Sequence, residues 1–337
     1  MRGIDQTRPG AESHPPPRER DRPAFSILIP LHREGPDFRR CLEACQALEW
    51  NDFEVIVVSD VPVADLPPSV VSIVTGAEGD TSPAEKRDRG FEHARGEVVA
   101  YLDDDAFPAP PWLTAAAAHF SDQAVAAVGG PGVTPLDSPW REQVGGSVYE
   151  SPLGSGPLRH RFWPLAARYV DDFPAFNLMV RREALETVGG WGTTFYGGED
   201  TILCLKLAAT GKRVLYAPDV VVFHRRRPIL RPHLRQIANV GRHRGYFMRR
   251  YPDNSRRLLY FLPALVPIVL CLAVVAAWYR PVAVGLVALA GYLVVVIEAA
   301  RRDPLRVALA MPFVLVAHHL AYGLAFARGS LGRPLTR

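Results

Sequence analysis

The sequence predicts an α/β domain with a mixed, mainly parallel sheet, followed by a helical membrane region. Two observations carry this prediction. Between residues 24 and 224, short β-rich runs alternate with stretches of helical periodicity, which is typical of parallel sheets covered by helices. Beyond residue 257 the chain becomes almost continuously apolar. Because single hydrophobic cores rarely grow beyond about 300 residues, a chain of 337 residues has room for a second unit.

The elements of the α/β part follow one another in a regular order. The runs FSILIP, FEVIVVSD and EVVAYL are predicted to be strands at 25–30, 53–60 and 97–102. The stretches between them, 37–50 and 83–95, have the 3.6-residue spacing of helices. Ligands of such sheets bind outside the carboxyl ends of the strands. The residues that follow each strand are therefore the first candidates for a binding site.

Four segments are predicted along the chain. Residues 1–23 are rich in proline and charge and lack the apolar run of a targeting signal, so we expect a disordered tail. Residues 24–224 form the α/β domain. Residues 225–257 contain eleven arginines and one acid, and we expect an amphipathic segment at the membrane interface. Residues 258–329 form the membrane region.

The basic segment, 225–257, could bind nucleic acid, lipid phosphate or nothing at all. Because it adjoins the apolar region, anionic lipid or the phosphate of a lipid substrate is favoured as its partner, and nucleic acid is not expected. A simply solvated helix face is the alternative.

Apolar runs at 258–278, 281–297 and 307–327 match the thickness of a bilayer core. The third run contains one proline and two histidines, so it could instead lie in the interface or re-enter the membrane, and we expect two or three spanning helices. Arginines lie before the first run and after the second. By the positive-inside bias, residues 1–257 are predicted to face the cytoplasm.

Three adjacent carboxylates, Asp103, Asp104 and Asp105, follow the third predicted strand. In an extended stretch alternate side chains share a direction, so Asp103 and Asp105 can converge while Asp104 points away. A hard divalent cation, Mg²⁺ or Mn²⁺, would relieve the repulsion between them. Capping of a helix that begins near Pro110 by one of the acids is the alternative.

A second acidic pair, Glu199 and Asp200, follows a glycine-rich loop and precedes an amphipathic stretch. Backbone N–H groups and the helix dipole favour negative charge at such a position. Taken alone, the pair is explained by ordinary helix capping.

Seven stretches together resemble a known family. They are, in order, ILIPLHRE, EVIVVSD, AEKRDRG, AYLDDDAF, FNLMVRREALETVGGW, GGEDTILCLKL and GKRVLYAPDVVVFHRRRP. From Phe25 to about His224 the chain resembles a family 2 glycosyltransferase of the GT-A fold, which is a Rossmann-like, mainly parallel sheet with flanking helices. The apolar C-terminal region is similar to the anchor of bacterial members that build polysaccharides and glycolipids.

The resemblance implies a role for each donor-side residue. Pro30 and Asp60 match the region that holds the base and ribose of the nucleotide, and Arg87 matches a basic position near the nucleotide. Asp103 and Asp105 match the first and third residues of the DxD element, which contacts donor and metal, with Asp105 the more direct ligand.

On the acceptor side, Asp200 matches the catalytic base, and Glu199 matches a residue that helps to hold the acceptor. His224 matches a position that sometimes ligates the metal, with packing or a phosphate contact as the alternative. Two departures stand out. Asp88 occupies a position where the family often has asparagine, and Gln236 is not followed by the Arg-Trp of processive synthases, so we expect one sugar per encounter.

The resemblance thus implies an inverting enzyme that moves one sugar from a UDP-, GDP- or dTDP-sugar to a hydroxyl of a polyprenyl-linked or glycan acceptor. It implies a divalent cation, Mn²⁺ or Mg²⁺, membrane lipid as a partner, and a place in a bacterial-type inner membrane. The alternatives are a polyprenyl-phosphate monosaccharide synthase, a membrane-tethered nucleotidyltransferase and a non-catalytic nucleotide-sugar-binding module.

Overall fold

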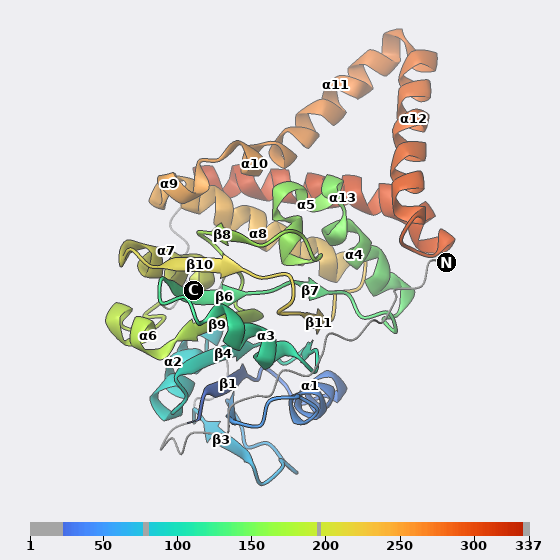
Figure 1. Ribbon diagram of the computed structural model, residues 1–337. Coiled ribbons are helices and arrows are strands. Elements are labelled where there is room, and N and C mark those ends of the chain that lie inside the picture. Colours follow the sequence, from blue (N-terminus) through green and yellow to red (C-terminus); the bar gives the residue numbers. More distant parts are fainter. Residues whose placement is uncertain (1–22, 77–80, 194–196, 333–337) are drawn as a thin grey trace.

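The computed structural model describes residues 23–76, 81–193 and 197–332 (Figure 1). The tail predicted at 1–23 lies outside the described residues except for Pro23. In Figure 1 a layered α/β domain lies against long C-terminal helices, and two of these helices rise away from the rest of the molecule as a hairpin.

A mixed sheet forms the centre of the domain, and eight of its strands lie in the described part of the chain, in the order β3-β2-β1-β4-β9-β6-β10-β8. Strands β1 to β4 pair in parallel, and β9 runs antiparallel between β4 and β6. This confirms the predicted mixed sheet. The strands are β1 (Phe25–Pro30), β2 (Phe53–Ser59), β3 (Val70–Val74), β4 (Val98–Leu102), β6 (Val125–Gly129), β8 (Arg168–Val170), β9 (Asn177–Arg181) and β10 (Arg213–Tyr216).

A small second sheet brings the end of the domain back to the acidic motif. It contains β5 (Ala106–Pro108), β11 (Val222–His224) and β7 (Gly132–Val133), with β11 in the middle. In the antiparallel β5–β11 pair, His224 lies opposite Ala106. This register places the last residue of β11 beside the acids that precede β5.

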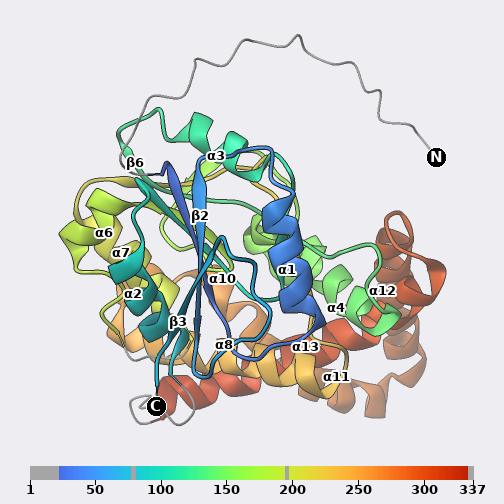
Figure 2. The same ribbon diagram turned by 90° about the horizontal axis from the view of Figure 1, so that it is seen from below.

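Helices cover both faces of the large sheet, and α1 and α2 lie on opposite sides of it (Figure 2). Alternation along β1 explains this arrangement, because Ile27 and Ile29 pack in one core cluster and Leu28 packs in the other. The helices are α1 (Pro36–Gln46), α2 (Pro83–His93), α3 (Trp112–His119), α4 (Trp140–Glu150), α5 (Pro152–Ser155), α6 (Arg182–Val188) and α7 (Glu199–Ala209), with a 3₁₀ turn, η1, at Gly156–Arg161.

Strand β3 is an element that the sequence did not predict. Its residues are half-buried or exposed because it lies at the edge of the sheet and pairs with β2 alone. Its sequence, VVSIV, is rich in β-branched apolar residues and fits a strand, although the sequence analysis did not single it out.

All regular elements described after β11 are helices. They are α8 (Arg231–Arg250), α9 (Pro252–Ser255), α10 (Leu258–Phe261), η2 (Pro263–Leu265), α11 (Val266–Tyr279), α12 (Pro281–Ala300) and α13 (Leu305–Leu331). Among the described residues, three helical segments are long and apolar enough to cross a membrane: 258–279, 281–300 and 305–331.

Helix α13 differs from the α11–α12 hairpin because it packs on the rest of the protein. Half of its apolar window is buried, against 6% and 11% for the other two segments. It runs beside α8 with close backbone contact: a Cβ atom on Gly241 would lie 2.5 Å from the carbonyl oxygen of Tyr322, and one on Gly245 would lie 2.1 Å from that of Phe326. Small residues four apart allow such an approach between helices.

Candidate active site

The three adjacent acids lie in a turn between β4 and β5. The extended conformation predicted for them is therefore wrong. The N–H of Ala106 donates to the carbonyl of Asp103 at 3.0 Å and closes the turn. The side chain of Asp104 does diverge from its neighbours, as predicted, and accepts a hydrogen bond from the backbone N–H of His32 at 2.9 Å. The turn, rather than strand alternation, separates the side chains. Helix α3 has no side-chain cap from these acids.

Asp103, Asp105 and His224 form a group that could hold a divalent cation. One ligand atom from each lies within 4.8 Å of the other two. His224 Nε2 is 2.9 Å from Asp105 Oδ1, and all three residues are half-buried. Burial alone would raise the pKa of Asp105, but His224 and Arg227 bring it below its ordinary value. Carboxylate oxygens are ligands for Mg²⁺ or Mn²⁺, and an imidazole nitrogen is a common ligand of transition metals, so the three groups are compatible with a divalent cation.

Arg87 links the two acidic motifs. Its guanidinium group lies 3.0 Å from Asp103 Oδ1 and 3.4 Å from Glu199 Oε1, and it stacks over Trp191 with 4.7 Å between the guanidinium carbon and the ring centroid. The side chain is buried between them. A buried arginine that contacts two carboxylates holds both of them in place, because loss of either contact would leave charge unpaired away from water.

Asp60 lies apart from that group, near the ends of β1 and β2. It accepts a hydrogen bond from Thr75 and forms an ion pair with Lys86, each at 2.8 Å. Lys86 also donates to the carbonyl of Leu31, directly after Pro30, at 2.8 Å. The sequence did not single out Lys86, although it precedes Arg87 in the AEKRDRG stretch. Lys86 and Arg87, adjacent in α2, thus contact two different acidic groups.

Asp88, which departs from the family pattern, holds the loop that leads to α7. Its carboxylate accepts hydrogen bonds from the N–H groups of Trp191 at 2.8 Å and Gly192 at 3.0 Å. A carboxylate can accept both bonds through its two oxygens, whereas an asparagine offers one acceptor oxygen.

Glu199 and Asp200 form the first turn of α7. The loop before them requires left-handed backbone at Gly197 and Gly198, with φ of 96° and 98°, which glycine adopts without steric cost. Glu199 accepts a bond from the N–H of Gly197 at 2.7 Å, and Asp200 accepts one from the N–H of Thr201 at 2.9 Å. Burial, followed by the negative charges of Glu199 and Asp172, raises the pKa of Asp200 to about 7.

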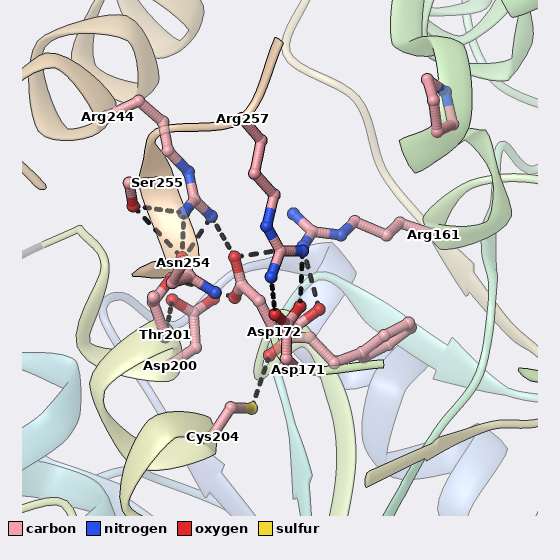
Figure 3. Close-up of polar contacts among 12 residues, drawn as sticks. Arg161, Asp171, Asp172, Asp200, Thr201, Cys204, Arg244, Asn254, Ser255 and Arg257 are labelled. Atoms are coloured by element: carbon pink, nitrogen blue, oxygen red, sulfur yellow. Dashed lines mark hydrogen bonds and ion pairs between the residues drawn. The ribbon is translucent and has the colours of Figure 1, made fainter. Parts of the chain in front are cut away.

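An ionic cluster behind Asp200, buried at Asp172 and Arg244, was missed by the sequence reasoning. Figure 3 shows Arg161, Arg244 and Arg257 converging on Asp171 and Asp172. Asp172 forms ion pairs with Arg244 and, at 3.3 Å, with Arg161. Burial alone would raise the pKa of Asp172, but the two arginines hold it well below its usual range. The adjacent acids in YVDDF were the one available signal.

Arg244 differs from most arginines of the basic segment 225–257. It is buried, with 8% of its surface exposed. The reason is its partner, Asp172, 72 residues earlier in the chain. Other arginines of α8, such as Arg235 and Arg242, are exposed.

Comparison with known proteins agrees with this geometry. Residues 26–189 match the model of the family described as glycosyl transferase family 2. The pre-mycofactocin glycosyltransferase of Mycobacterium tuberculosis is 28% identical over 260 residues, which cover 74% of this chain and 52% of that protein. Glycosyltransferase AglE of Haloferax volcanii is 25% identical over 225 residues, covering 61% and 68%. The chain thus spans about half the length of the Mycobacterium tuberculosis relative.

Among solved structures, the mannosyltransferase PcManGT from Pyrobaculum calidifontis, in complex with GDP-Man and Mn²⁺, superposes with a TM-score of 0.59 at 20% identity. The match covers 90% of this chain and 87% of that one, and it supports the GT-A fold. From the family match and this fold we conclude that residues 26–189 are a domain of glycosyl transferase family 2, and that the chain carries three apolar C-terminal helical segments.

Proposed function

We propose that this enzyme transfers a single sugar, with inversion, from a nucleotide-sugar donor to a hydroxyl of a lipid-linked or glycan acceptor in cell-surface polysaccharide or glycolipid assembly. The observation that carries the proposal is the contact of Arg87 with both acidic motifs, which joins a metal-binding group and a base into one site. A non-catalytic binding module would not require a base beside the metal group.

The reaction assigns a role to each side chain. Asp200 accepts the proton of the acceptor hydroxyl as the oxygen attacks the anomeric carbon, and the nucleoside diphosphate departs with the bonding electrons. Its pKa of about 7 suits a general base that works near neutral pH. Glu199 helps to hold the acceptor, while Arg87 fixes one of its oxygens and offers positive charge near the departing diphosphate.

On the donor side, Asp60 and Lys86 lie where the base and ribose are bound, and the chain near Pro30 forms the adjoining wall. Asp103, Asp105 and His224 would hold the divalent cation. When bound, that cation supplies positive charge for the phosphate oxygens of the leaving group.

The acceptor reaches the site from the membrane in this proposal. The apolar helical segments anchor the protein, and exposed arginines of α8, such as Arg235 and Arg242, contact anionic headgroups. The positive-inside bias favours a catalytic domain on the cytoplasmic side of a bacterial-type inner membrane. A polyprenyl-linked sugar would present its hydroxyl at the same membrane surface, close to the headgroups.

The test is release of nucleoside diphosphate by the detergent-solubilised protein across UDP-, GDP- and dTDP-sugars, with and without Mn²⁺. GDP-mannose comes first, because it is the donor in the complex of the Pyrobaculum calidifontis mannosyltransferase. We expect metal-dependent release from one donor, lost in Asp105→Ala and Asp200→Asn. Release of pyrophosphate instead would favour a nucleotidyltransferase, and donor binding without turnover on any acceptor would favour a binding module.

The product then separates the remaining alternatives. Polyprenyl-linked sugar, glycan, polyprenyl phosphate and pre-mycofactocin are tested as acceptors, the last because of the name of the Mycobacterium tuberculosis relative. Transfer to polyprenyl phosphate alone would assign a lipid-phosphate monosaccharide synthase. An NMR coupling constant that shows retention of the anomeric configuration would overturn the inverting mechanism.

A further inference from the structure

Helix α8, in the segment that joins the catalytic domain to the apolar helices, sends one buried arginine into the catalytic domain. Arg244 forms an ion pair with Asp172, and its other guanidinium nitrogen donates to Asn254 Oδ1 at 3.1 Å. Its guanidinium carbon lies 4.5 Å from the ring centroid of Tyr260 in α10. Arg244 therefore connects the loop after β8 with α9, as Figure 3 shows, and also contacts α10.

The same cluster holds the backbone that presents Asp200. Thr201, the next residue, donates its hydroxyl to Asp172 Oδ1 at 2.9 Å, and Arg244 donates to that hydroxyl oxygen at 3.3 Å. The N–H of Thr201 in turn donates to Asp200 at 2.9 Å. Two hydrogen bonds thus run from Arg244 to Asp200 through a single residue, so displacement of Arg244 would release the first turn of α7.

The charges around Asp200 come from several elements. Besides its neighbour Glu199, the groups that act on it are Asp172 from the loop after β8, Arg161 from η1, Arg244 from α8 and Arg87 from α2. Asp172 opposes ionisation of Asp200, while the arginines favour it. Removal of Arg244 and removal of Asp172 should therefore change the proton affinity of Asp200 in opposite directions.

We infer that Arg244 and Asp172 are positioning residues for Asp200, so that α8 completes the catalytic site of the enzyme. The inference rests on the proposed role of Asp200 as the base. Arg244 holds the α7 turn through Thr201 and balances the charge of Asp172 behind it. Neither residue needs to touch the substrate.

The pH dependence of kcat/KM for nucleoside diphosphate release, measured with the donor that the panel selects, tests the charge role. In Arg244→Gln the carboxylate of Asp172 keeps Arg161 but loses its other cation, so the acid limb should move up by about one pH unit, and in Asp172→Asn the limb should move down. The double variant should return the limb toward that of the unmodified protein. Equal losses at every pH, with no movement of the limb, would overturn the charge role.

Hydrogen–deuterium exchange tests the positioning role without a donor. Peptides that contain the first turn of α7 should exchange faster in Arg244→Gln than in Arg242→Gln, which removes an exposed arginine from the same helix. Arg244→Lys keeps the positive charge but has fewer hydrogen-bond donors. The acid limb of its pH profile should therefore lie close to that of the unmodified protein, while the first turn of α7 should still exchange faster. Unchanged exchange in Arg244→Gln would overturn the inference.

Asp200→Asn separates the two levels of the argument. If its residual activity keeps the original acid limb, Asp200 is not the base and the proposed function fails at that residue. If the limb disappears in Asp200→Asn but does not move in the Arg244 and Asp172 variants, only the inference about positioning fails. Melting temperatures of all variants in detergent exclude those that do not fold.

Discussion

The two acidic clusters of the site are stabilised in different ways. Asp103 and Asp105 are half-buried, and their partners include His224 and the exposed Arg227. Asp172, on the other side, is buried, and its partners are the buried Arg244, 72 residues later in the chain, and the half-buried Arg161. In the first cluster the partners of Asp105 can give way to a cation and a phosphate, while the buried Arg87 keeps its contact with Asp103. The second is fixed by the fold, because an unpaired charge there would be strongly destabilising.

The largest effect should come from Asp200, which lies in front of the fixed cluster of Asp172, Arg161 and Arg244. Asp200→Asn removes the base, and we expect kcat to fall by about 10² to 10⁴-fold with little change in donor affinity. Glu183→Gln is the matched control, because Glu183 is an exposed acid in the first turn of α6. Steady-state kinetics with the selected donor measure both. An equal fall of kcat in Asp200→Asn and Glu183→Gln would contradict a specific role for Asp200.

The exchangeable cluster should respond through metal affinity. Asp105→Ala removes one of the three grouped ligand atoms, and we expect Mn²⁺ to bind about 10- to 100-fold more weakly, or worse. Asp104→Asn, which alters the side chain that holds His32, should change the constant far less. Titration calorimetry with Mn²⁺ and nucleoside diphosphate gives both constants. Equal weakening would show that charge alone, and not ligation, matters.

The pH dependence should set the two clusters apart in the unmodified protein. Because the folded-state pKa of Asp200 is raised to about 7, and the base must be ionised, kcat/KM should fall by about tenfold for each pH unit below 7. The pKa of Asp105 is lowered, so metal binding should persist over the first part of that fall. Parallel loss of rate and of Mn²⁺ binding would contradict this separation.

The smallest effect concerns the loop that leads to the fixed cluster. Asp88→Asn keeps one acceptor oxygen for the N–H groups of Trp191 and Gly192, so we expect a loss of about 1 kcal/mol in the free energy of unfolding. Chemical denaturation in detergent measures it. A much larger loss would mean that the carboxylate charge, rather than the hydrogen bonds, stabilises the loop.

Local patterns were sufficient for much of the fold and for the chemistry of the exchangeable cluster. Strands β1, β2 and β4 were predicted because they are buried apolar runs, and Asp103 and Asp105 because they follow one. The pairing of Arg244 with Asp172 was not predictable, because burial of an arginine depends on a partner that is remote in the sequence. A basic run near apolar helices looks the same whether its members face lipid or a buried carboxylate.

The close glycine contacts between α8 and α13 limit where the polypeptide can be cut. A recombinant fragment that ends near residue 257 would lose α13 and leave the α8 surface around Ile237, together with Tyr149, open to water. A shorter fragment that ends before α8 would lose Arg244 and leave Asp172 with one fewer cation. The smallest well-behaved form of this enzyme should therefore include α13, and detergent will be needed to purify it.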